Sequence, residues 1–273
     1  MKRFGPKLGL GTIVATAAAS LALSPALGLG QSQAATFAAS TPTVGIAPDG
    51  PTVLASAIAR SEPTTTHSNR VALPSDGFPT LQVRDGKRVD LHSSPDGKVV
   101  DSVSDTTEFG NPVVLSVVKR KGNWAGVPTQ LLPNGQLAWV KLNEKQLEID
   151  SVHQEIRIDL SDYSAKLLRN GEVERSWEVG IGAPDTPTPT GRFSITDEIQ
   201  DDLNPAYGCC VLALSATQPN LPADWTGGNR MAIHGTSEPL GEANSTGCVH
   251  SGESDLLALI ERAPLGTPVT ISR

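Results

Sequence analysis

The chain has 273 residues, of which 19% are charged and 4% are aromatic, and it contains 26 glycines and 21 prolines. This composition is typical of globular protein joined to irregular chain, and the length allows one large domain or two modest ones. The formal net charge of −7 argues against nucleic acid as a partner, because binding phosphates requires a basic surface. It gives no support to attraction by anionic lipid either.

The first 35 residues have the order of a secretory signal peptide. A basic start (Lys2, Arg3 and Lys7) precedes an apolar run over residues 8–29, and small residues suitable for cleavage follow near Ala34. An uncleaved anchor is the alternative, because the run is long enough to span a membrane. We therefore expect an exported protein, located outside the cytoplasm in the cell wall or secreted. Residues 36–78 are rich in Ala, Ser, Thr and Pro and predict a disordered linker.

The three cysteines do not read as a disulfide framework. Exported proteins usually pair their cysteines, but the number is odd, and Cys209 and Cys210 are adjacent while Cys248 is remote. Adjacent cysteines pair only through a strained ring, so at least one free thiol is expected. The favoured interpretation of the adjacent pair is a small core residue next to an exposed thiol. A redox partner for Cys248 is the lesser alternative.

Residues 79–148 predict a small β module. The run "NPVVLSVVKRKGNWAGV" and the run "LLPNGQLAWVKL" each combine β-rich sequence with a turn, and Asn134-Gly135 is typical of a hairpin. Trp124 and Trp139 are expected on neighbouring strands, both filling the core of a small barrel. The pattern "GNW…V…PNG…AWV" resembles SH3-like modules of exported bacterial cell-wall proteins. That resemblance implies a positioning or binding module, with cell-wall binding as its role.

Residues 151–273 predict a second, mainly β domain. "EIRIDL" alternates, and "AKLLRNGEVERSWEVGIG" is a hairpin with Val173, Trp177, Val179 and Ile181 on one face. "RFSI", "CCVLAL", "RMAIHG" and "TPVTI" are further strands. One helix follows Gly252. Its expected cap is Ser251 or Ser254, and its expected packing face is Leu256, Leu257 and Ile260.

The stretch "STGCVH", residues 245–250, raises a question of chemistry. Cysteine reacts as the thiolate, and the start of the following helix would favour that form of Cys248. Gly247 allows the chain to bend so that the consecutive backbone N–H groups of Thr246, Gly247 and Cys248 turn inward as an oxyanion hole, and the Ser245 hydroxyl can hold the turn. Fourteen residues before Cys248, in "AIHGT", His234 ends an apolar strand where a base would be well placed.

Two structural interpretations compete with catalysis. A lone buried cysteine is most often an inert small hydrophobe. A zinc site made of Cys248, His234 and His250 lacks an obvious fourth ligand, and no metal is expected. The residues alone place cysteine–histidine catalysis only slightly ahead of structural packing.

The order of four motifs resembles a known family. "TPTPTGRFSI", "MAIHGT", "STGCVH" and "GTPV" follow one another as in bacterial L,D-transpeptidases, which cross-link peptidoglycan and share a β-rich catalytic fold. The resemblance covers residues 152–273. It implies Cys248 as the nucleophile and His234 as its base. It also implies that the Gly235 carbonyl orients the imidazole, and that no cofactor is needed.

The reaction that this family implies has two halves. Cys248 attacks the carbonyl before the terminal D-alanine of a stem tetrapeptide, D-alanine leaves, and an amine of a neighbouring stem then forms a 3→3 cross-link. Water as the acceptor would make the protein an L,D-carboxypeptidase. A non-catalytic cell-wall binding or scaffold protein is the alternative from another class. Carbapenems are the inhibitors that the resemblance implies.

The sequence departs from the family pattern at two positions. Thr246 stands where the family usually carries histidine, which leaves the stability of the thiolate open. His250 stands where an arginine or asparagine is often found. We expect His250 either to meet a substrate carboxylate when protonated or to be a polar residue at a helix start.

Overall fold

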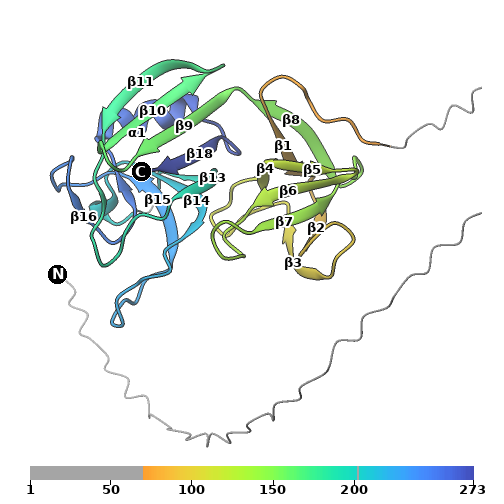
Figure 1. Cartoon of the computed structure of the whole chain (residues 1–273), viewed down its shortest axis with the longest axis horizontal. Helices are drawn as coiled ribbons and strands as arrows, with labels where there is room; N and C mark the ends of the chain where they lie inside the picture. Colours follow the sequence, from red (N-terminus) through yellow and green to blue (C-terminus); the bar gives the residue numbers. More distant parts are fainter. Residues whose placement is uncertain (1–69, 202) are drawn as a thin grey trace, which may run out of the picture. The chain divides into compact units, whose positions relative to one another are not determined.

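The computed structural model describes residues 70–201 and 203–273 (Figure 1). The predicted signal peptide lies outside the described residues, as does most of the predicted linker, so both stay predictions. In the described part of the chain, no helix has the length and apolar character needed to cross a membrane. The fold is mainly β with one α-helix in this part, as the sequence predicts.

The N-terminal part of the described chain is built from eight strands in two sheets. One sheet has the strand order β4-β1-β8 and the other the order β3-β2-β7-β6-β5. Their inner faces enclose a core of aliphatic side chains, with Leu81, Leu91 and Leu147 fully buried. The bounds are β1 Phe78–Val83, β2 Arg88–His92, β3 Val99–Ser104, β4 Val114–Ser116, β5 Lys119–Lys121, β6 Trp124–Pro128, β7 Leu137–Lys141 and β8 Leu147–Val152.

The two tryptophans of this module lie on neighbouring strands. Trp124 is buried, at 7% exposed, but neither tryptophan belongs to the aliphatic core between the sheets. Strands β6 and β7 pair antiparallel, with Gly126 opposite Trp139. Because side chains alternate along a strand, burial of Ala125 and Ala138 in the core turns Trp124 and Trp139 to the other face. There Trp124 meets the edge of the His92 ring at 4.8 Å. The SH3-like identity of the module stays a prediction.

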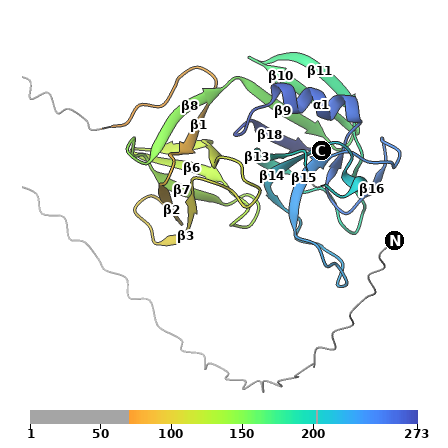
Figure 2. The same cartoon turned by 180° about the vertical axis from the view of Figure 1, so that it is seen from behind.

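The C-terminal part is built on an eight-stranded sheet with the order β11-β10-β9-β18-β13-β14-β15-β17, beside a two-stranded β12-β16 pair (Figures 1 and 2). Its core contains the fully buried Ile156, Leu167, Leu212 and Ile233. The bounds are β9 Gln154–Asp159, β10 Ser164–Arg169, β11 Glu172–Glu178, β12 Ile181–Gly182, β13 Gly191–Ile199, η1 Pro205–Tyr207, β14 Val211–Thr217, β15 Arg230–His234, β16 Ala243–Ser245, β17 Val249–His250, α1 Glu253–Arg262 and β18 Pro268–Ser272.

The β10–β11 hairpin forms as predicted, with one shift of register. Asn170 and Gly171 form its turn, both with positive φ. A bulge then pairs Leu168 with Val173 and Leu167 with Arg175, which changes the face of the following residues. Val173 is consequently 54% exposed. Its expected place on the buried face beside Trp177 is therefore wrong.

Helix α1 packs against the core through two of the three predicted residues, Leu256 and the partly buried Ile260, together with Leu259. Leu256 and Leu259 are fully buried, whereas Leu257 is 51% exposed and was wrongly assigned to the core. Gly252 occupies the N-cap position without a side-chain cap, so neither predicted serine caps the helix. On the outer side, Asp255 pairs with Arg175 of β11 at 2.6 Å.

Polar contacts join the two parts next to strand β15. Arg230, the first residue of β15, pairs with Glu108 at 2.7 Å and with the fully buried Asp197 at 2.8 Å. Asn134, from the β6–β7 loop, accepts a hydrogen bond from the Thr217 backbone N–H at 3.0 Å. The strand that carries His234 is thus held at its first residue by the N-terminal module.

Candidate active site

Strands β15 and β17 bring the two predicted catalytic side chains to one place. The strands pair in parallel, with His234 opposite His250, and Cys248 immediately precedes β17. Cys248 contacts the backbone of Ala232, two residues before His234 on β15, and His250 lies opposite His234. The two imidazole rings lie 4.8 Å apart, between centroids.

The geometry of His234 leaves one ring nitrogen free to accept a proton. Nδ1 donates to the Gly235 carbonyl oxygen at 2.6 Å, because a carbonyl can only accept, and Nε2 therefore carries the lone pair. Burial lowers the pKa of His234 to about 4, opposed by the Gly235 hydrogen bond and by Glu238, with His250 lowering it further. At neutral pH the ring is uncharged and can act as a base.

Cys248 is held as a thiol in the free protein. Burial raises its pKa, and a hydrogen bond from the backbone N–H of Ala232 opposes that only in part. The expectation that the helix start favours the thiolate is wrong, because α1 begins five residues later and carries Glu253 and Asp255 in its first turn. A reaction at this sulfur therefore needs a base to remove its proton.

Residues 245–248, the nucleophile turn, are fastened by the hydroxyl that the sequence points to. Ser245 Oγ donates to the Cys248 carbonyl at 2.6 Å and accepts from the Gly247 backbone N–H at 3.0 Å. Gly247 has φ of +114°, which a residue with a side chain rarely adopts. Because the Gly247 N–H is already bonded, the predicted oxyanion hole is reduced to the N–H groups of Thr246 and Cys248.

Three side chains that sequence analysis did not single out hold the nucleophile turn from behind. Thr186 donates to the Ser245 carbonyl at 3.1 Å, and Thr188 donates to the Gly247 carbonyl at 2.8 Å. Gln218 Nε2 donates to the Thr246 carbonyl at 3.3 Å and to carbonyls of the 186–187 segment. All three side chains are buried. Thr186 and Thr188 belong to the "TPTPT" motif, and their hydrogen bonds to the nucleophile turn give this motif a physical role.

The η1 turn covers His234 from the other side. The Tyr207 and His234 rings meet edge-on, with 4.8 Å between their centroids. The backbone carbonyl of Tyr207 accepts a hydrogen bond from the Gly235 N–H at 2.8 Å. A Cβ on Gly235 would press against the backbone of Gly208, so glycine is required at this contact. No sequence pattern marked Tyr207, because it reaches the site from a distant loop.

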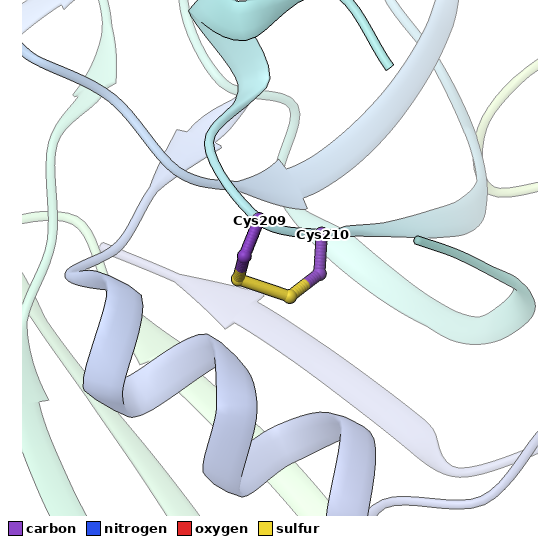
Figure 3. The surroundings of a disulfide bond; sticks show 2 residues. All are labelled: Cys209 and Cys210. Carbon is purple, nitrogen blue, oxygen red and sulfur yellow. A yellow bond between two sulfur atoms is a disulfide. The ribbon is translucent and has the colours of Figure 1, made fainter. Parts of the chain in front are cut away.

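Cys209 and Cys210 form a disulfide with each other directly before β14 (Figure 3). The expectation of one exposed thiol is therefore wrong, while Cys248 is the free cysteine among the described residues. Cys210 is 1% exposed and belongs to the core that α1 covers. Val211, the residue after the disulfide, pairs with His234, so the disulfide lies directly beside the strand pair that carries the proposed base.

His250 is a buried residue of β17 and not a residue at the helix start, which makes that alternative wrong. It is 8% exposed, and burial lowers its pKa. Its nearest carboxylate is that of Glu238, at 3.6 Å from Nδ1. Over residues 70–201 and 203–273, no group of three or more His, Cys, Asp or Glu side chains is arranged to hold a metal.

Comparison with known proteins assigns the C-terminal part to one family. Residues 153–271 match the L,D-transpeptidase catalytic domain, YkuD. YkuD of Bacillus subtilis, to which an L,D-transpeptidase function is attributed, is 30% identical over 120 residues, covering 43% of this chain and 65% of the relative. YqjB of the same organism is 30% identical over 115 residues, covering 39% and 64%. The chain thus spans about two thirds of the length of these relatives.

Solved structures of the same class are also matched. The catalytic domain of an E. faecium L,D-transpeptidase is 24% identical, with 43% of this chain and 95% of that chain covered and a TM-score of 0.32. LD transpeptidase LdtMt1 in complex with imipenem is 15% identical, with 50% and 72% covered and a TM-score of 0.37. By its sequence match over residues 153–271, the C-terminal region of this chain is a YkuD-type L,D-transpeptidase catalytic domain.

Proposed function

We propose that the protein is a peptidoglycan L,D-transpeptidase that forms 3→3 cross-links through a thioester on Cys248. The observation that carries this proposal is that β15, which ends at His234, pairs with β17, the strand that begins directly after Cys248. An uncharged imidazole, with Nδ1 bonded to the Gly235 carbonyl, lies on the strand beside Cys248. Together with a thiol that burial keeps protonated, this is the arrangement of a nucleophile and its general base.

The first half-reaction acylates the enzyme. The thiol proton passes to His234 Nε2 as the sulfur bonds to a carbonyl carbon of the stem peptide. This carbonyl joins the L-configured centre of the third residue to the terminal D-alanine. The bond to D-alanine then breaks, and the proton leaves with its amine. The Thr246 and Cys248 N–H groups stabilise the developing oxyanion, since the Gly247 N–H is bonded to Ser245.

The second half-reaction releases the acyl group. An amine of a neighbouring stem attacks the thioester carbonyl, an amide bond forms, and the sulfur leaves. Chemistry at this site needs no metal or organic cofactor, because the nucleophile, base and oxyanion donors all belong to the chain. If water attacks in place of the amine, the same site is an L,D-carboxypeptidase.

Carbapenem acylation is the direct test of the nucleophile. We expect the intact mass to rise by one drug mass, and Cys248→Ala to abolish the increase; LdtMt1, a matched protein, has been solved in complex with imipenem. His92→Ala, in the N-terminal module, is the matched control and should acylate like the parent. A label on Cys209 or Cys210, or an unlabelled parent protein, would contradict the assignment and favour a scaffold protein. Mass spectrometry of muropeptides then distinguishes 3→3 cross-linking from L,D-carboxypeptidase activity, which only removes the terminal D-alanine.

We also propose that the chain is exported and that its N-terminal module binds the cell wall. The supporting observations are the order of residues 1–35 and the folded β module ahead of the catalytic domain. Deleting residues 79–148 should reduce binding to isolated sacculi. Undiminished binding of the deleted protein would overturn this role of the module.

A further inference from the structure

A small polar gap lies above Gly180, next to the proposed base. Among the described residues, four buried side-chain nitrogen or oxygen atoms lack a hydrogen-bond partner, and His250 Nδ1 and Asn244 Oδ1 are two of them. Both atoms lie 3.5 Å from the position that a Cβ on Gly180 would take. An unpaired buried polar atom costs about 1–3 kcal/mol, so two of them facing one gap call for an explanation.

The orientation of Asn244 is determined by its other contact. Its Nδ2 donates to the Pro239 carbonyl at 3.2 Å, and a reversed amide would set two acceptors against each other. Oδ1 is therefore the atom that faces the gap. Glu238 Oε2 lies 3.6 Å from His250 Nδ1, just beyond hydrogen-bond distance.

These neighbours define the tautomer of His250. Asn244 Oδ1 and Glu238 Oε2 can only accept, so the proton of a neutral His250 ring belongs on Nδ1. Its Nε2 then carries a lone pair, as His234 Nε2 does beside it. The charged or titratable groups that face His250 are His234 from β15, Glu238 from the loop after β15, and Cys248 on its own segment.

Two basic nitrogens suit a reaction with two nucleophiles. We propose that His250 is a second proton acceptor of the site, which takes the proton of the acceptor amine as that amine attacks the thioester. Glu238 and Asn244 are its positioning residues. This inference rests on the proposed transpeptidase function, in which His234 serves the thiol.

The second step then balances as follows. The amine nitrogen bonds to the thioester carbon, its proton moves to His250 Nε2, and the carbon–sulfur bond breaks. The sulfur leaves as thiolate and recovers a proton from the charged His250 ring, since burial favours the protonated form of Cys248. The products are the new amide, the thiol and a neutral His250.

A rapid-quench experiment separates the two steps. The purified chain is mixed with a tetrapeptide donor ending in D-alanine and an excess of a diamino acid stem as acceptor, and acyl-enzyme, free D-alanine and cross-linked product are followed by mass spectrometry. His250→Gln keeps an N–H donor but removes the basic ring nitrogen. We expect the second step to fall about 10²- to 10⁴-fold, the usual effect of a positioned base, so that acyl-enzyme accumulates.

The positioning residues are tested by smaller changes. Gly180→Ala would set a Cβ 3.1 Å from His250 Cβ and fill the gap, so it should slow the second step more than the first. Gly228→Ala is the matched control, because nothing lies within 4 Å of its Cβ position. Glu238→Gln removes the carboxylate that lies 3.6 Å from His250 Nδ1 and that also raises the pKa of His234. The low-pH limbs of both steps should therefore move to lower pH, and the shift of the second step should be the larger. A purely structural role would not move the limb of the second step further than that of the first.

The outcomes distinguish this inference from the proposed function. If His250→Gln lowers both steps equally, or cross-links as fast as the parent without accumulating acyl-enzyme, His250 is not a second base, although the transpeptidase proposal stands. If the parent never forms an acyl-enzyme on Cys248, the proposed function itself fails.

Discussion

The nucleophile turn and the Gly180 gap are neighbouring parts of the candidate active site, yet they are built in opposite ways. In the turn, Ser245, Thr186, Thr188 and Gln218 satisfy the backbone groups around Cys248. In the gap, His250 Nδ1 and Asn244 Oδ1 are buried without partners. The carbonyl groups of the turn that carries the covalent chemistry are all bonded. The side that we assign to the incoming amine keeps unused hydrogen-bonding capacity.

The largest expected effect comes from removing the proposed base. His234→Ala should slow carbapenem acylation about 10²- to 10⁴-fold, because a buried thiol then has no positioned proton acceptor. Stopped-flow acylation between pH 5 and 9 measures it. A variant that acylates at the parental rate would take histidine out of the first step and leave the N–H groups of the turn as the only activation.

Stability should depend on pH through the same histidine. The pKa of His234 is lowered from 6.5 to about 4 on folding, so in this interval the unfolded chain binds a proton that the folded protein excludes. Stability is therefore complete above pH 6.5 and falls as the pH drops toward 4, by about 3 kcal/mol for this group. Urea unfolding at pH 7 and pH 4.5 should show the loss. His234→Gln should reduce the difference, and an unchanged difference would contradict it.

A smaller loss is expected on the side of the nucleophile turn. Gln218→Ala removes the donor to the Thr246 carbonyl and to two carbonyls of the 186–187 segment. Leaving buried carbonyls unpaired should lower stability by about 2 kcal/mol and slow acylation as the turn loosens. Gln136→Ala, at an exposed position, is the control and should stay within about 0.5 kcal/mol of the parent. Equal urea midpoints for both variants would show that the clamp is dispensable.

The parts of this domain that depend on the pattern of neighbouring residues along the chain could be predicted from the sequence. The strands, the Asn170-Gly171 turn and the single helix follow from alternation, turn residues and helical period. The bulge between Leu167 and Leu168 did not, and it moved Val173 to the surface. A bulge depends on how two strands settle against a common core, which the pattern of either strand alone does not contain.

The candidate site divides in the same way. Cys248, His234 and Gly235 carry motifs, whereas Gln218 and Tyr207 each lie 28 residues earlier in the chain than the backbone group that they hold. Single-sequence patterns hold no information on such pairings. The Cys209–Cys210 bond was missed because adjacent cysteines were judged too strained to pair.

That bond has a consequence for handling the protein. A reductant added to keep Cys248 in its reactive form also meets the Cys209–Cys210 link, one residue before the strand that pairs with His234. A reductant that protects Cys248 can therefore also open the disulfide next to the strand that supports His234. Thiol counts by a colorimetric reagent, before and after denaturation, tell the two states apart, because an intact link leaves one reactive sulfur per chain and an opened link leaves three.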